Sequence, residues 1–331
     1  MEFVFVSDSP EQVRGGIERH AAALAAELRG RGHGVRLVPP AELTRRDVDG
    51  ADWVVFDGVR RLAMLRHARR GSVRPRFAVI PHGAFLEEAH VGTLRQGGVW
   101  TPTARFHLRR AFDRSVGRRV FARFDRWIAL NQSEAADLVR LCGVPADRID
   151  PIGPFVSPEF LAAAAGPPGP APAGGPYVCS VARIERRKNF GALIEAVSDL
   201  PYRFLLAGQD RGGLAELVAT ARNFPAAQWE YLGTIPEGRK VDLLRGAEAV
   251  VIPSVAEGVP ALALEARALG RPVVLAGVSY GPEGPGVVRC GARASAIRAA
   301  LESLPRRPPV PPDSPLTVER AADQFLAALG R

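Results

Sequence analysis

Cysteine, lysine and long apolar runs are all scarce in this sequence of 331 residues. Its three cysteines, Cys142, Cys179 and Cys290, lie far apart and form no C-x-x-C pair, so we expect reduced, buried thiols and no zinc site. No apolar run approaches the roughly 20 residues that span a bilayer, and the start of the chain lacks the positive leader of a signal peptide. These absences predict a cytoplasmic protein, which would meet a membrane only from the side.

The basic residues are almost all arginine. Lys188 and Lys240 are the only lysines among 44 basic residues, and the net charge is +9. Arginine in place of lysine, together with abundant Ala, Gly and Pro, is also what genomic base composition produces. Because the sequence contains no recognisable nucleic-acid recognition module, we expect no nucleic-acid partner.

Short apolar runs alternate with helical patterns along the chain. In the first half these runs begin at Phe3, Val35, Trp53, Phe77 and Trp127. Continuous short runs are typical of buried parallel strands. Their alternation with helices predicts an α/β fold built from right-handed βαβ units.

Residues 166–176 are almost entirely Gly, Pro and Ala, and they divide the chain. We therefore predict a Rossmann-like domain over 1–165, a linker over 166–176 and a second Rossmann-like domain over 177–315. A final helix over 316–331 would cross back to the first domain. Ligands of open parallel sheets bind beyond the carboxyl ends of the strands, which predicts two domains facing each other across a cleft.

The most informative segment is residues 250–275. Val250 to Ile252 reads as a strand, and a helix is expected from Pro260, which suits a first helical turn, to a stop at Gly270. The free N–H groups at the start of this helix form an anion site. Gly258 would let the backbone approach a ligand closely.

Two glutamates, Glu257 and Glu265, lie on either side of this helix start. One interpretation places both carboxylates around a bound diphosphate, where they reach sugar hydroxyls. The alternative is an ordinary strand–loop–helix with one capping glutamate and one solvated glutamate, and the spacing alone favours this alternative.

A second cluster of charge follows the apolar run at Tyr177. Arg183 and Lys188 are five positions apart in a loop before a predicted helix, where they would clamp a diphosphate. The alternative is a solvated basic turn, because Arg186 and Arg187 are also present. We expect Arg186 and Arg187 at the surface.

These two segments resemble the family 4 glycosyltransferases, which are retaining enzymes with the GT-B fold. The family's hallmark is a pair of glutamates eight positions apart after a P-S strand end, with an R-x4-K-N loop earlier in the same domain. The resemblance implies that Glu257 contacts the donor sugar and Glu265 the ribose. It also implies that Arg183 and Lys188 hold the donor diphosphate.

The resemblance implies further donor contacts at neighbouring strand ends. Asp210 stands where the family has a second glycine, and residues 284–291 are shorter than the family pattern and read as a loop near the donor. The implied donor-binding residues are Glu265, Gly258, Val259, Pro260, Gly208, Gly233, Thr234 and Ile235.

The first domain carries weaker signals. Gly15 and Gly16 follow the first strand, in a position where the family has a similar loop facing the cleft. His82 follows the strand at Phe77 and is a candidate catalytic residue, although a lone histidine is often structural. Asn131 follows the strand at Trp127 and would line the same cleft.

Asp47-Val48-Asp49 is a D-x-D triplet of the kind that metal-dependent transferases use. It follows polar residues rather than an apolar strand, so we read it as a surface turn. The family needs no metal for its chemistry. We therefore expect neither a metal nor a cofactor, with a nucleoside-diphosphate sugar as substrate.

Residues 103–127 carry eight arginines and two aspartates. Apolar residues recur there at spacings of three and four, which predicts one helix with a core-facing side formed by Leu108, Phe112, Val116, Val120, Phe124 and Trp127. The opposite side is either a solvated basic face or a surface for anionic lipid headgroups or an acidic acceptor. The second interpretation predicts a peripheral protein at the inner face of the plasma membrane.

These features predict a retaining glycosyltransferase that moves a sugar from a nucleoside-diphosphate sugar to an acceptor hydroxyl. The acceptor would be a lipid-linked or cell-envelope glycan or a small molecule, bound mainly by the first domain. Two alternatives remain open: a GT-B-fold nucleotide-sugar epimerase, which needs no acceptor, and a non-catalytic binding protein that retains the fold.

Overall fold

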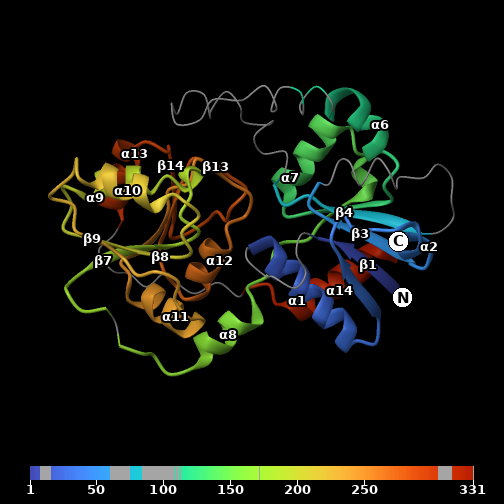
Figure 1. The fold of residues 1–331 in the computed structure, drawn as a ribbon, viewed down its shortest axis with the longest axis horizontal. Helices are drawn as coiled ribbons and strands as arrows, with labels where there is room; N and C mark the ends of the chain where they lie inside the picture. Colours follow the sequence, from blue (N-terminus) through green and yellow to red (C-terminus); the bar gives the residue numbers. More distant parts are fainter. Residues whose placement is uncertain are drawn as a thin grey trace. The chain divides into compact units, whose positions relative to one another are not determined.

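The computed structural model describes residues 1–7, 16–59, 75–83, 108, 111, 113–170, 172–304 and 315–330. These residues form two compact units (Figure 1). Unit 1 holds the described residues up to Pro158 together with the last helix, and unit 2 runs from Glu159 to Pro315.

The boundary between the units lies before helix α8 (Pro158–Ala165), whereas we predicted it at 166–176. The reason is packing. Phe160 on α8 is fully buried, and its ring lies 5.1 Å from the ammonium group of Lys240 in unit 2. Gly169 donates from its backbone N–H to Asp242, so the Gly/Pro segment is attached to unit 2 as well.

Unit 1 is built on a parallel sheet with strand order β2-β1-β3-β4-β5-β6. Its strands are β1 (Glu2–Val6), β2 (Gly34–Val38), β3 (Trp53–Asp57), β4 (Arg76–Ile80), β5 (Arg126–Ala129) and β6 (Ile149–Pro151). Its α-helices in the described residues are α1 (Gly16–Gly30), α2 (Arg45–Asp49), α6 (Arg118–Phe121), α7 (Gln132–Asp137) and α14 (Val318–Leu329). The five strands predicted from apolar runs are confirmed within one or two residues.

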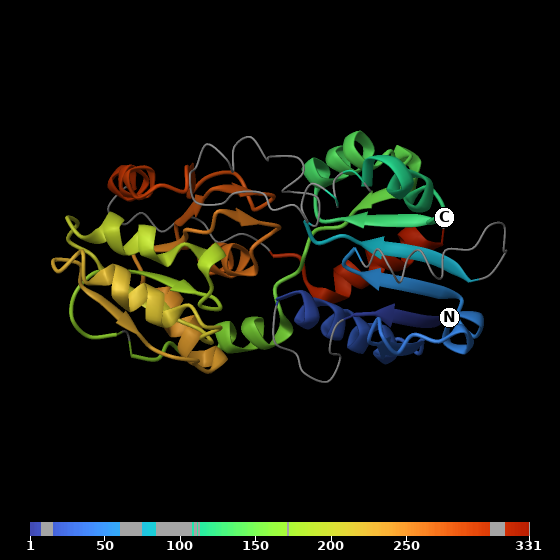
Figure 2. The same cartoon turned by 45° about the horizontal axis from the view of Figure 1, so that its top comes forward.

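Alternation along the strands builds a core on each face of this sheet. In β1, Val4 and Val6 belong to one apolar cluster, and Phe3 and Phe5 belong to the other. Helices α1 and α14 lie side by side over the face that carries Phe3 and Phe5 (Figures 1 and 2). The final helix is therefore part of unit 1, although it is far from the other elements in sequence.

Unit 2 is built on a parallel sheet with strand order β14-β12-β10-β7-β8-β9. Its strands are β7 (Tyr177–Val181), β8 (Arg203–Ala207), β9 (Trp229–Tyr231), β10 (Ala249–Ile252), β12 (Val273–Ala276) and β14 (Val287–Cys290), with a separate pair of β11 (Ala256–Glu257) and β13 (Val278–Ser279). The remaining helices are α9 (Phe190–Val197), α10 (Leu214–Ala221), α11 (Glu237–Gly246), α12 (Ala261–Ala268) and α13 (Ala294–Ser303). Two parallel-sheet units confirm the predicted α/β class, while the cleft between them stays a prediction.

The short pair of β11 and β13 was not predicted, and neither were two strands of the six-stranded sheets, β6 and β14, which are edge strands. β6 has the sequence Ile-Asp-Pro, and β14 follows a segment rich in Gly and Pro. Neither has a fully buried apolar run, because an edge strand is covered less completely. The prediction of a loop over 284–291 was therefore wrong for its central residues, which pair with β12.

The single helix predicted over 103–127 is wrong in its described part. A π-helical turn, η1 (Asp113–Gly117), leads into the short helix α6, and the strand β5 begins at Arg126. Leu108 and Val116 are exposed rather than core-facing, at 71% and 50%. The predicted contributions of Phe112 and of Arg105, Arg109 and Arg110 lie outside the described residues.

Two smaller predictions can also be compared with the structure. Asp47 is not in a surface turn: it lies in α2, where Thr44 and Asp47 form a reciprocal capping box. Cys142 and Cys179 are buried and Cys290 is half-buried, and all are free thiols. Among the helices in the described part of the chain, none combines the length and apolarity needed to cross a bilayer.

Candidate functional site

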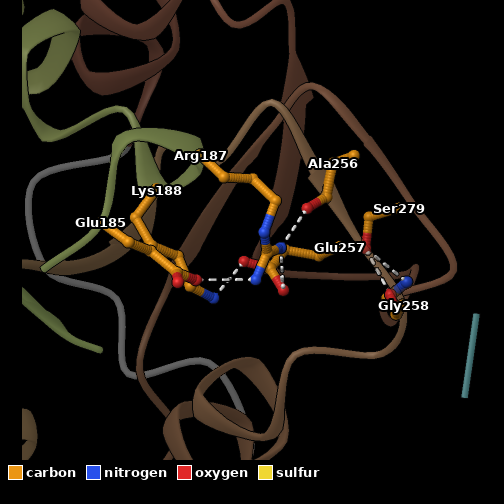
Figure 3. A network of polar contacts seen from close by, with 8 residues as sticks. Glu185, Arg187, Lys188, Ala256, Glu257, Gly258 and Ser279 are labelled. Carbon is orange, nitrogen blue, oxygen red and sulfur yellow. Dashed lines mark hydrogen bonds and ion pairs between the residues drawn. The ribbon is translucent and has the colours of Figure 1, made fainter. Parts of the chain in front are cut away.

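The carboxyl ends of β7 and β10 bring two charged loops of unit 2 together. These strands are parallel neighbours, with Cys179 beside Val250, so the loops that follow them emerge at the same edge of the sheet. The first loop contains a 3₁₀ turn, Arg186–Lys188, and the second contains β11. Figure 3 shows the polar network that joins them.

Glu257 is the centre of this network. Its Oε1 atom lies 2.5 Å from Nζ of Lys188, and its Oε2 atom lies 3.4 Å from Nη1 of Arg187. The side chains of Glu257 and Lys188 are only 11% and 14% exposed, so this ion pair is largely desolvated. Sequence reasoning chose both members but did not predict that they would contact each other directly.

Arg187 is the residue that sequence reasoning missed. We expected it at the surface, but it donates to the backbone carbonyl of Ala256 at 2.8 Å and to Glu185 at 2.9 Å, in addition to its contact with Glu257. Its neighbour Arg186 is exposed, as predicted. In a 3₁₀ turn successive side chains point about 120° apart, which separates these two arginines and cannot be read from a run of three basic residues.

The charges around Glu257 keep it ionised. Burial by itself opposes ionisation of this carboxyl, but the positive charges of Lys188 and Arg187 outweigh burial and lower the pKa of Glu257 below its ordinary value. Ser254 contributes a hydrogen bond in the same direction. The site therefore presents a carboxylate and two cations, rather than a neutral acid, at neutral pH.

The backbone beside Glu257 is held by the pairing of β11 with β13. The carbonyl of Gly258 accepts hydrogen bonds from the hydroxyl of Ser279 at 2.9 Å and from the N–H of Tyr280 at 3.1 Å. Helix α12 then begins at Ala261, with Pro260 as its N-cap residue and no capping side chain among the described residues. N–H groups at a helix start can bind an anion, and an anion site at the start of α12 stays a prediction.

Glu265 belongs to a different network. It lies in α12, is 6% exposed, and accepts a hydrogen bond at 2.6 Å from Lys240 on α11. Lys240 also contacts Glu237 at 2.9 Å. Glu257 and Glu265 therefore have separate cationic partners, and a contact between Glu265 and a ribose stays a prediction.

The other predicted donor residues lie at strand ends of the same sheet. Gly208 has a φ of 136°, and a Cβ atom there would lie 2.0 Å from the carbonyl oxygen of Ala182, so only glycine fits. Its N–H donates to the carbonyl of Gly233 at 2.8 Å. Thr234 and Ile235 follow Gly233, exposed and half-buried respectively.

Two charged side chains at this edge have different roles. Asp210, in place of the family's second glycine, accepts hydrogen bonds from the N–H groups of Gly212, Gly213 and Leu214, and so holds the turn that leads into α10. Arg183 is half-buried and forms no ion pair with any residue that the structure describes. Val259 is half-buried in the loop that leads to α12.

Unit 1 has its own polar group at the carboxyl ends of its strands. Nε2 of His82, after β4, lies 2.6 Å from Asp57 at the end of β3. Asp57 is fully buried and also accepts a hydrogen bond from Ser7, which follows β1, at 2.8 Å. Burial opposes ionisation of Asp57, but the positive charge that His82 can carry lowers its pKa.

Asp57 was not predicted, because it ends an apolar run and looks like a strand residue. His82 has a left-handed backbone with a φ of 52°, and this conformation turns the chain at the end of β4. The register between β3 and β4 pairs Asp57 with Ile80, two residues before His82, which brings the two side chains together. Knowledge of the strand order would have been needed to find this pair.

The remaining predicted residues of unit 1 have partners of their own. The side chain of Asn131 accepts from the N–H of Glu134 at 2.9 Å and caps α7. The carboxylate of Glu134 is buried and accepts from the N–H groups of Gly83 and Leu130, at 2.6 and 2.8 Å. Burial raises the pKa of Glu134 above its ordinary value. Gly16 begins α1, and Gly15 lies outside the described residues.

Two protein-family models match this chain. The model described as "Glycosyl transferases group 1" matches residues 167–284, and the model described as "Glycosyltransferase Family 4" matches residues 14–160. Together they cover most of both units.

Curated relatives match part of the chain. A D-inositol 3-phosphate glycosyltransferase of Nocardia farcinica is 32% identical over 183 residues, which is 50% of this chain and 40% of the relative. A protein of the same name from Rhodococcus erythropolis is 32% identical over 218 residues, covering 59% of this chain and 49% of the relative. The chain thus spans about half the length, or less, of these relatives.

Solved structures share the fold over its whole length. A sucrose-phosphate synthase from Thermosynechococcus elongatus superposes with a TM-score of 0.69 at 16% identity, covering 99% of this chain and 94% of the other. The Anabaena protein HepE, solved with UDP and glucose, gives a TM-score of 0.64 at 15% identity, covering 100% and 95%. At such identities these likenesses show the fold alone.

Proposed function

We propose that this chain, which belongs to the family 4 glycosyltransferases, transfers a sugar from a nucleoside-diphosphate sugar to an acceptor hydroxyl with retention of configuration. The observation that carries the proposal is the network of Glu257, Lys188 and Arg187 at the strand ends of unit 2, next to the start of α12. Family membership supports the reaction class, and the network supplies the charges that this reaction needs.

The departing diphosphate carries negative charge that must be stabilised. Lys188 is a flexible point charge within reach, Arg183 lies on the same loop, and the N–H groups at the start of α12 add partial positive charge. Glu257 would support the sugar and the positive charge that develops at its anomeric carbon. We propose that these groups act without a metal ion, so turnover should persist in excess EDTA.

The acceptor is proposed to bind to unit 1, near His82 and Asp57. An imidazole beside a buried carboxylate, whether neutral or charged, is suited to form a hydrogen bond with a hydroxyl of the acceptor substrate or of the donor sugar. The class of acceptor is a lipid-linked or cell-envelope glycan or a small molecule. The curated relatives act, by their names, on an inositol phosphate, which makes a phosphorylated polyol a first compound to try.

The test is a panel of UDP- and GDP-sugars screened by thermal shift, followed by measurement of nucleoside-diphosphate release. We expect one donor class to raise the melting temperature, and Glu257→Gln to lower turnover by roughly 10²–10³-fold while the fold survives. Conversion of the donor to an epimer without an acceptor would identify an epimerase. Donor binding without release for any acceptor would indicate a binding protein.

We also propose that unit 1 associates with anionic membranes. Val116 and Val139 are 50% and 42% exposed, and the arginines Arg118, Arg119 and Arg140 around them are exposed too. The turns η1 and η2 (Leu138–Cys142), which carry the two valines, pack against each other. Apolar side chains ringed by arginine suit an interface with anionic headgroups.

Liposome flotation tests this surface. Wild-type protein should float with vesicles that contain phosphatidylglycerol, and Val116→Ser with Arg119→Gln should reduce that recovery several-fold. Arg211→Gln, at an exposed arginine of unit 2, is the matched control. Equal recovery with neutral and anionic vesicles would remove the proposal.

A further inference from the structure

Arg187 and Lys188 contact the same carboxylate in different ways. Arg187 has partners on two segments: Glu185 in its own loop, and both Ala256 and Glu257 on β11. Among the residues that the structure describes, Lys188 has a single ionic partner, Glu257. Figure 3 shows both cations reaching Glu257 from the same loop.

The partners of Arg187 hold it more firmly than Lys188 is held. The carbonyl of Ala256 belongs to a strand whose pairing with β13 fixes its direction, so the 2.8 Å hydrogen bond from Arg187 anchors the guanidinium to backbone. The carbonyl of Ala256 and the carboxylate of Glu185 accept from different nitrogens of the guanidinium, whose planar shape fixes both directions at once. The ammonium of Lys188 has a single contact and no such constraint. Lys188 can move to a new anion by rotating its side chain, whereas Arg187 would have to break three contacts.

A diphosphate at this site competes with Glu257 for Lys188. The proposed function requires an ammonium to neutralise the leaving group, and this ammonium is paired with Glu257 in the structure. If Lys188 moved to the phosphate with no other support, Glu257 would be left as a largely buried carboxylate without its closest cation. Arg187, on the other carboxylate oxygen, would then still give Glu257 a cationic partner.

We infer that Arg187 is a positioning residue that holds the Glu257 carboxylate in place when the donor diphosphate draws Lys188 away. The inference rests on the proposed function. It predicts that Arg187 acts on turnover through Glu257 and contributes little to the binding of a nucleoside diphosphate. Lys188, which would hold the diphosphate itself, should contribute to nucleotide binding as well as to turnover.

The experiment compares Arg187→Gln, Arg187→Lys and Lys188→Gln with Arg186→Gln as the matched control, because Arg186 is exposed and its ion pair with Glu216 is long, at 3.7 Å. Affinity for UDP, GDP, ADP and dTDP is measured by calorimetry, and kcat and KM are measured with the sugar of whichever nucleotide binds. We expect Arg187→Gln to lower kcat at least tenfold and leave nucleotide affinity within about twofold. Lys188→Gln should weaken nucleotide binding at least tenfold, and Arg186→Gln should change neither quantity.

The conservative variant separates a bridging role from a charge alone. Arg187→Lys retains the charge but cannot span the three acceptors, so it should recover only part of the lost kcat. Full recovery, or a loss of nucleotide affinity in Arg187→Gln equal to that in Lys188→Gln, would overturn the inference and make Arg187 a phosphate ligand.

A thermal double-mutant cycle keeps the inference testable if wild-type protein binds none of UDP, GDP, ADP and dTDP, a result that would remove the proposed function. Arg187→Gln, Glu257→Gln and the double variant are compared by melting temperature. If Arg187 holds Glu257, the double variant should lose less than the sum of the two single losses. Additive losses would show that the two residues are not coupled and would overturn the inference.

Discussion

Among the residues that the structure describes, the carboxyl ends of the two parallel sheets carry different charged groups. In unit 2 these ends carry Arg183, Arg187 and Lys188 around one carboxylate, Glu257. In unit 1 they carry the buried carboxylates of Asp57 and Glu134 with His82. Two parallel sheets can thus present different polar groups, because the residues at and after the strand ends differ between them.

The comparison also extends within unit 2, which contains both lysines of the chain. Lys188 and Lys240 each pair with one glutamate of the family hallmark. Lys240 is buried against Glu265, Glu237 and the ring of Phe160, while Lys188 lies at the ligand edge. We therefore expect one lysine to serve stability and the other to serve chemistry.

The largest expected effect is on stability. Lys240→Met removes the ammonium that donates to the buried carboxylate of Glu265 and should cost roughly 3–5 kcal/mol of unfolding free energy, measured by urea denaturation. Lys188→Met is the matched control and should cost much less stability while abolishing most turnover. If both variants lost the same unfolding free energy, the expectation that Lys240 serves stability and Lys188 serves chemistry would be wrong.

A smaller effect is expected from the carboxylate of unit 1. Asp57→Asn removes the charge beside His82 and weakens the bond from Ser7, so it should cost roughly 1.5–3 kcal/mol of stability. Asp49→Asn, at an exposed helix-end pair, is the control. The cost should be largest near neutral pH, because the lowered pKa of Asp57 makes its stabilisation present above the carboxyl's ordinary pKa and lost in acid. If the stability lost in Asp57→Asn were the same at every pH, Asp57 would not stabilise the fold as a charged carboxylate.

The smallest expected effect concerns His20. Its ring stacks on Phe155 with centroids 4.4 Å apart, and burial, reinforced by His82, lowers its pKa from 6.5 to about 3. A lowered histidine pKa means that the unfolded chain takes up a proton between these values and the folded chain does not, so stability falls as pH drops below 6.5. Between pH 7 and 5 the loss should be roughly 1–2 kcal/mol, since the partly exposed ring moderates the shift.

Urea denaturation of His20→Gln at several pH values checks this. The variant should show a flatter dependence of stability on pH than the wild type. His33→Gln, near the amino terminus, should keep the wild-type dependence. An unchanged slope in His20→Gln would show that other groups dominate acid destabilisation of unit 1.

Local patterns were enough to predict most of the sheet architecture and to select Glu257 and Lys188, which the structure brings into contact. Apolar runs located the strands because burial on both faces leaves a continuous signal, and Pro260 and Gly270 marked the ends of α12 because their backbone preferences are intrinsic. The edge strand β6 was missed because its sequence, Ile-Asp-Pro, contains no run of apolar residues.

What the sequence predicted by itself is the fold class, the resemblance to family 4 glycosyltransferases and the choice of Glu257, Glu265 and Lys188 as candidate site residues. Only the tertiary structure decided which charges meet. Glu265 is 25 positions from Lys240, and Asp57 is 25 from His82, while Glu257 is 69 from Lys188. Such pairs depend on strand order and on the direction in which a turn points each side chain, and neither is encoded in local spacing.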